Sequence, residues 1–128
     1  MRKLMRLVVE HGTGTMAAAP GYVVGGKTGT ADKVSGRHYE DRKLLSSFVG
    51  VFPINDPKYL VLAMVDEPHP NKQSHGYATA GWTVAPATSR IVQRIAPLLG
   101  VDPVDESSPE IQRALAVDSL QGKKIEAY

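Results

Sequence analysis

A lysine and two threonines lie close together in the stretch Lys27-Thr28-Gly29-Thr30. In a strand, this stretch would present an ammonium group and two hydroxyls along one short edge, which suits a ligand that carries a carboxylate. Gly29 has no side chain and would let a second backbone approach, so an extended peptide could add to the strand edge. The four residues therefore predict a site for a peptide-like ligand with a carboxylate.

The same residues also complete a phosphate-loop pattern. Gly21 to Thr28, GYVVGGKT, satisfies GxxxxGK(S/T). Such a loop needs a strand before it and a helix directly after it, because backbone N–H groups and the helix N-terminus bind the phosphates. Here Pro20 precedes the pattern, and the residues after Thr28, GTADKVSGR, have no helical period. This context disfavours nucleotide binding.

The composition is that of one small globular domain. The chain has 128 residues, of which 42% are hydrophobic and 22% charged, and its net charge of +2 favours no nucleic-acid partner. It has no cysteine, which excludes disulfides and thiolate chemistry. His69 and His75 could be imagined as a metal pair, but no carboxylate is interleaved with them. We therefore interpret them as solvated loop histidines, and we expect no metal and no cofactor.

The first elements that must position Lys27 are a helix and a loop. Leu4, Leu7 and Val8 recur at helical spacing, which predicts an amphipathic helix that ends at His11–Gly12. Arg2, Lys3 and Arg6 would form its solvated face. The basic start does not make this segment a signal peptide, because Arg6 interrupts the apolar run. The breaker-rich residues 12–21 predict a loop.

Three segments have strand character, namely residues 22–34, 43–53 and 58–67. The joins between them, residues 35–42 and 54–57, are short and polar, which favours antiparallel neighbours. The third segment, KYLVLAMVDE, is a nearly continuous apolar run, so we expect a strand that is buried on both faces. Asp66 and Glu67 are interpreted as the end of this strand rather than as a catalytic acid pair.

A helix and a tail complete the predicted order. A polar loop over residues 67–81 precedes a helical face that begins at Val84, with Pro86 near the helix start and Gly100 as its stop. Residues 101–110, VDPVDESSPE, resemble a linker, and Ser108-Pro109-Glu110 within them predicts the start of a short helix. Trp82 would pack between helix and sheet. The expected fold class is α+β, an antiparallel sheet of about three strands with flanking helices.

Several longer stretches resemble one family. LMRLVVEHGTG, PGYVVGGKTGTADKV, LLSSFVGVFPINDPKYLVLAMVDEP and YATAGWTVAPATSRIVQRIAPLLGV are similar to the C-terminal part of the transpeptidase domain in class B, FtsI-type penicillin-binding proteins. Lys-Thr-Gly is one of the motifs that these proteins share with serine β-lactamases. The resemblance divides the chain into a portion of the transpeptidase domain at residues 1–101 and a linker with a short helical tail at 102–128.

The resemblance implies peptidoglycan cross-linking during septal wall synthesis, at the periplasmic face of the inner membrane. A serine attacks the D-Ala-D-Ala bond of a stem peptide, and β-lactams acylate the same serine. Lys27 would organise the proton network and the positive field, and Thr28 and Thr30 would hold the carboxylate beside Gly29. The backbone N–H of Thr30 would complete the oxyanion hole. Tyr77 would line the groove, and cell-division proteins are implied as partners.

The nucleophile motif of that family, Ser-x-x-Lys, does not occur in this sequence. None of the serines, at positions 35, 46, 47, 74, 89, 107, 108 and 119, has a lysine three residues later, and no Ser-x-Asn exists either. We therefore expect the isolated chain to be inactive, as the C-terminal piece of a longer enzyme whose serine and membrane anchor lie upstream. Faces that pack on the missing part would be exposed and would favour self-association.

Two alternatives stay open at this stage. The chain could be a non-catalytic binding module that keeps the same strand edge but never had a serine. Less favoured is a nucleotide-binding domain that uses the phosphate-loop pattern.

Overall fold

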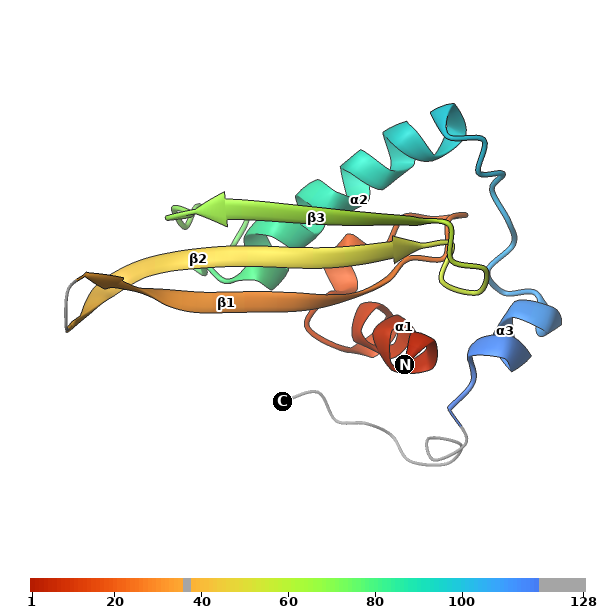
Figure 1. The fold of residues 1–128 in the computed structure, drawn as a ribbon, viewed down its shortest axis with the longest axis horizontal. Coiled ribbons are helices and arrows are strands. Elements are labelled where there is room, and N and C mark those ends of the chain that lie inside the picture. Colours follow the sequence, from red (N-terminus) through yellow and green to blue (C-terminus); the bar gives the residue numbers. More distant parts are fainter. Residues whose placement is uncertain (36–37, 118–128) are drawn as a thin grey trace.

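The computed structural model describes residues 1–35 and 38–117, and gives only the backbone for the strand residues 35 and 38–42. In chain order, the elements are α1 (Arg2–His11), η1 (Thr15–Ala17), β1 (Gly25–Ser35), β2 (His38–Phe52), β3 (Tyr59–Asp66), α2 (Ala80–Leu98) and α3 (Pro109–Leu115). The strands form one antiparallel sheet in the order β1-β2-β3 (Figure 1). The predicted α+β class and the three antiparallel strands are confirmed.

The register of the sheet separates a covered face from an open one. Phe48 and Phe52 of β2 are fully buried and pack against Val84 and Val92 of α2, which crosses this face of the sheet (Figure 1). Because strand side chains alternate, the residues between them point to the opposite face. There, Lys27 is paired with Val49, and Val49 with Leu62. The sheet thus has one face packed on α2 and one face that carries Lys27.

The prediction that β3 is buried on both faces is wrong. Leu60, Leu62 and Met64 are 66%, 55% and 54% exposed, and only the alternate residues approach α2. The apolar run indicates that the strand favours burial, but no element in the described part of the chain covers the second face of β3. Strand β2 begins earlier than expected, because residues 38–42 belong to it rather than to a polar join, whereas β1 begins at Gly25, three residues later than predicted.

The interpretation of α1 also requires a correction. Arg6 is buried, at 7% exposed, whereas Leu4 of the predicted apolar face is 54% exposed. The guanidinium tolerates burial because each of its nitrogens finds an acceptor: Nε donates to Glu10 at 2.8 Å, and the two terminal nitrogens donate to the Val24 carbonyl at 2.9 Å and to Glu106 at 3.4 Å. The buried face of α1 is therefore the one with Arg6 and Val9.

Helix α2 begins at Ala80, earlier than its periodicity predicts, so Pro86 lies inside the helix and not near its start. The early start turns Trp82 outward. It is 37% exposed and stacks on Tyr77 with ring centroids 5.8 Å apart, instead of packing between helix and sheet. The predicted stop is confirmed: Gly100 has φ +73°, and the N–H groups of Gly100 and Val101 donate back to Pro97 and Ala96.

The residues after Val101 pack against the start of the molecule. The Glu106 carboxylate contacts Arg6 and accepts a 2.8 Å hydrogen bond from the Val23 N–H, and the Val104 N–H donates to the Gly21 carbonyl. Helix α3 begins as expected, with the Ser108 hydroxyl accepting from the Ile111 N–H. The division into a domain at 1–101 and a tail at 102–128 stays a prediction, and residues 118–128 of that tail lie outside the described residues.

Candidate carboxylate site

The candidate site is carried by β1, an outer strand of the sheet. No strand in the described part of the chain pairs with its second edge, and an unpaired edge is the feature that an extended peptide can join as an added strand. The first residues of β1 must be glycine for packing reasons. A Cβ on Gly26 would lie 2.3 Å from the Val49 carbonyl and 2.4 Å from the Phe48 ring, and one on Gly25 would lie 2.6 Å from Ile54.

A strained turn sets the direction in which β1 starts. Val23 has φ +46°, a left-handed conformation that a β-branched residue rarely adopts. Its N–H donates to Glu106, its carbonyl accepts from the Ile54 N–H at 2.8 Å, and its side chain is fully buried. These three contacts hold the strain, and they fix the turn two residues before β1 begins.

Lys27 supplies the positive charge of the site. Its side chain is exposed, and its Nζ donates to the carbonyl of Thr28 at 2.8 Å. Within the described residues, no carboxylate forms an ion pair with Lys27. The ammonium charge therefore stays uncompensated and available to an anionic ligand.

Thr28 and Thr30 lie on the opposite face of β1 from Lys27, beside the start of α2 and the loop after α1. The Thr30 hydroxyl accepts a 3.1 Å hydrogen bond from the Ala80 N–H, the first helical residue of α2. The hydroxyls of Thr28 and Thr13 lie 2.7 Å apart. Because the Thr30 oxygen is used as an acceptor, its own proton remains free to donate to a ligand. The positive end of the α2 dipole points at the same hydroxyl.

Gly29 lies between these residues, and the structure gives it an additional reason to be glycine. A Cβ at this position would lie 2.6 Å from the Ser47 Oγ of β2, and that hydroxyl donates to the Gly29 carbonyl at 3.3 Å. The close approach of Ser47 explains the glycine by packing, and the role of Gly29 beside a ligand stays a prediction.

The loop between β3 and α2 brings Tyr77 near this region. Tyr77 is 56% exposed and lies three residues before Ala80, whose N–H contacts Thr30. Trp82 supports its ring from one side, and His75 contacts Trp82 edge-on with centroids 5.2 Å apart. This contact of His75 with Trp82 was not visible in the sequence, because it depends on the early start of α2.

Two sequence interpretations are settled by this geometry. Thr28 lies inside the strand β1, and the next element after β1 is the strand β2. A phosphate loop needs a helix directly after the lysine and threonine, so this segment does not have the strand–loop–helix arrangement. Asp66 ends β3, and Glu67 is the first residue after the strand, so the two acids mark the strand end as predicted. Although they are neighbours, both contact the Nζ of Lys33, at 3.0 Å and 2.8 Å, because Glu67 leaves the strand with φ +49°.

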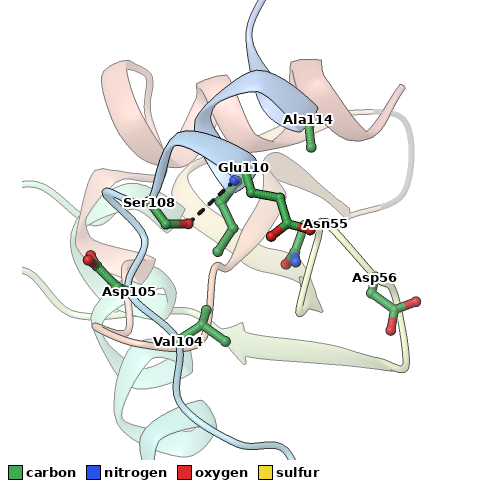
Figure 2. Close-up of a pocket in the computed structure, with 8 residues that line it drawn as sticks. Asn55, Asp56, Val104, Asp105, Ser108, Glu110 and Ala114 are labelled. Atoms are coloured by element: carbon green, nitrogen blue, oxygen red, sulfur yellow. Dashed lines mark hydrogen bonds between the residues drawn. The ribbon is translucent and has the colours of Figure 1, made fainter.

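A hollow lies between α3 and the turn after β2, apart from the residues of β1 (Figure 2). Asp56, Asp105 and Glu110 give it an acidic rim, and Val104 and Ala114 line its apolar part. Among the residues that the structure describes, no group of three or more acidic, histidine or cysteine side chains could hold a metal ion. Nor does any described helix have the length and apolar character needed to cross a membrane.

Strand β1 thus presents an ammonium group on one face and two hydrogen-bonded hydroxyls on the other, at the outer edge of an antiparallel sheet. The chain belongs to the family of penicillin-binding protein transpeptidase domains, whose model matches residues 1–90. The predicted resemblance to FtsI-type members is confirmed.

Three relatives illustrate the relationship. A probable peptidoglycan D,D-transpeptidase FtsI of Caulobacter vibrioides is 46% identical over 110 residues, which cover 79% of this chain and 19% of that protein. The transpeptidase domain of Burkholderia pseudomallei penicillin-binding protein 3 is 40% identical with a TM-score of 0.68, and the match covers 81% of this chain and 30% of that domain. Penicillin-binding protein 3 of Mycobacterium tuberculosis, solved with ampicillin, is 28% identical with a TM-score of 0.69. That match covers 86% of this chain and 25% of the Mycobacterium tuberculosis chain. The chain therefore spans about a fifth of the curated relative's length.

Proposed function

We propose that this chain is the carboxylate-binding portion of a peptidoglycan D,D-transpeptidase that acts in septal wall synthesis. The observation that carries the proposal is the set of donors on β1. Lys27 provides an uncompensated ammonium, and Thr28 and Thr30 provide two hydroxyls held by protein contacts. The terminal carboxylate of a D-Ala-D-Ala stem peptide is an acceptor-only anion that matches these donors.

In this proposal, the substrate peptide lies along the free edge of β1, next to Gly29 and Tyr77. A serine from another segment attacks the carbonyl between the two D-alanines, the terminal D-alanine departs, and an acyl-enzyme forms. An amine of a second stem peptide then takes the acyl group and releases the serine. The Thr30 N–H would stabilise the oxyanion of each tetrahedral intermediate, and Lys27 would hold the positive field and the proton network.

The proposal extends to ligands, partners and place of action. A penicillin such as ampicillin carries a carboxylate on the ring fused to its β-lactam, so the same donors would bind it, and the relative from Mycobacterium tuberculosis was solved with ampicillin. We infer that the whole protein acts at the periplasmic face of the inner membrane, together with cell-division proteins. Support for this comes from the FtsI name of the relative in Caulobacter vibrioides.

The experiment that tests the proposal uses a fusion. The complete 128-residue chain replaces the matching C-terminal segment of the Burkholderia pseudomallei transpeptidase domain, which supplies the nucleophile. We expect a fluorescent penicillin to label the fusion covalently, and to leave the isolated chain unlabelled because the sequence has no Ser-x-x-Lys. Labelling of the isolated chain, or a folded fusion that is never labelled, would contradict the proposal.

Lys27→Met in the fusion should lower the acylation rate constant about tenfold to a hundredfold, the range expected for a hydrogen bond to a charged group. Lys58→Met is the matched control. Lys58 is also an exposed lysine, and its contact with Asp56 is 3.9 Å long. An equal effect of both substitutions would show that general surface charge, and not the β1 site, attracts the drug.

A further inference from the structure

The loop between α1 and η1 contributes one side chain to the candidate site. The Oγ1 of Thr13 lies 2.7 Å from the Oγ1 of Thr28, fifteen residues further along the chain. Thr13 was not predicted from the sequence as a site residue, because no pattern in the stretch GTGT indicates a contact with β1.

The position of Thr13 is tightly determined by its surroundings. The N–H groups of Gly12 and Gly14 both donate to the Val8 carbonyl at 3.1 Å. A Cβ on Gly12 would lie 2.9 Å from the Val8 backbone, and a Cβ on Gly81 would lie 2.5 Å from the Thr13 carbonyl. The loop is therefore held between the end of α1 and the first turn of α2, which leaves Thr13 little freedom to move away from Thr28.

The chemistry of the ligand decides the direction of this hydrogen bond. A carboxylate only accepts hydrogen bonds, so Thr28 must donate its proton to bind one. A hydroxyl has a single proton. If the Thr28 hydroxyl donated this proton to Thr13, it would have no proton left to donate to the ligand. When the carboxylate is bound, Thr13 must therefore be the donor and Thr28 the acceptor.

We propose that Thr13 is a positioning residue that orients the Thr28 hydroxyl toward the substrate carboxylate. The resulting chain runs from the Thr13 hydroxyl through the Thr28 hydroxyl to the carboxylate, and each bond in such a chain strengthens the next. It has a counterpart at Thr30, whose oxygen accepts from the Ala80 N–H. Both threonines of the site thus have their acceptor side occupied by protein and their donor side turned to the ligand. The inference rests on the proposed function.

The test compares two ligands in the fusion described above. Benzylpenicillin carries the carboxylate, and its methyl ester carries the same ring without the charge. Thr13→Val should lower the acylation rate with benzylpenicillin about fivefold to tenfold, and should leave the rate with the ester nearly unchanged. The ratio of the two rates is the readout, since a general loss of structure would lower both rates together.

Three further variants sharpen the result. Thr13→Ser keeps the hydroxyl and should restore the ratio. Gly81→Ala keeps Thr13 but pushes its carbonyl away, so it should lower the ratio as Thr13→Val does. Thr83→Val removes a hydroxyl that donates to the carbonyl of Thr79, the residue before α2, and should leave the ratio unchanged.

The outcomes separate this inference from the proposed function. A folded fusion that benzylpenicillin does not acylate overturns both. A fusion that is acylated, but whose ratio is the same with threonine and valine at position 13, overturns the role of Thr13 alone. A ratio that falls with Thr13→Val and is restored by Thr13→Ser supports it.

Discussion

Arg6 is the charged residue whose place in the fold differs most from its sequence pattern. Its side chain is 8% exposed and forms ion pairs with Glu10 and Glu106. Its substitution would remove the donor to the Val24 carbonyl and one of the donors to the Glu106 carboxylate, which keeps its hydrogen bond from the Val23 N–H. We expect Arg6→Met to lower the free energy of unfolding by about 2–3 kcal/mol, somewhat less than for a fully buried pair because both glutamates are partly exposed.

Chemical denaturation of the isolated chain measures this difference. Lys3→Met is the matched control, because Lys3 is an exposed cation on the same helix and should change stability by less than about 0.5 kcal/mol. Equal effects of the two substitutions would contradict the structural role assigned to Arg6.

Lys33 makes stability depend on pH. Hydrogen bonds to Glu67 and then Asp66 raise the pKa of Lys33 above its ordinary value of 10.5. A pKa that is raised in the folded state contributes stability below the unfolded pKa, and this contribution is lost as pH rises through the folded pKa. The stability difference between the unaltered chain and Lys33→Met should therefore be constant from about pH 7 to 9 and should shrink above about pH 10.5. A difference that grows in that range would contradict this assignment.

At the scale of elements, two glycines of β1, Gly26 and Gly29, differ in how closely their surroundings exclude a side chain. Gly26→Ala would force a Cβ against the backbone of Val49 and the ring of Phe48, so we expect a loss of about 1–3 kcal/mol in stability. Gly29→Ala would meet only the Ser47 hydroxyl, which can rotate, so it should cost less stability. Thermal unfolding of both variants checks the order, and a larger loss for Gly29→Ala would contradict it.

The sequence predicted the positions of the helices and strands better than it predicted which of their faces are buried. Strand character, antiparallel pairing and the Gly100 stop follow from local chemistry, and all three are found. The burial of Arg6 was not predictable, because its partner Glu106 lies 100 residues away. The outward position of Trp82 depends on where α2 begins, and that start is set by the contact between Ala80 and Thr30. Of the candidate site, the β1 residues were visible in the sequence, whereas Thr13 was not.

At the scale of the whole molecule, the open face of β3 dominates the expected solution behaviour. Leu60, Leu62 and Met64 form an exposed apolar row on an outer strand, which is a surface that favours association. We expect the sedimentation coefficient of the isolated chain to increase with concentration. The double substitution Leu60→Thr, Leu62→Thr should keep the chain at its monomer mass of 13.8 kDa.

Leu98→Thr provides the control for this experiment. Leu98 is 86% exposed, but it belongs to α2, which covers the face of the sheet opposite to the apolar row, so its replacement should not alter the association. If the unaltered chain remains monomeric at high concentration, the expectation drawn from the apolar row is wrong.

The hydrogen bond between Ala80 and Thr30 has a consequence for how such a protein can evolve. Because the Thr30 oxygen satisfies the first N–H of α2, a substitution that removes the hydroxyl also removes a contact between helix and sheet. If Thr30 binds β-lactams as proposed, selection for weaker drug binding at this residue would reduce stability at the same step. Under the same proposal, adaptive changes should accumulate at Thr13 and Tyr77, whose substitution leaves the helix its acceptor.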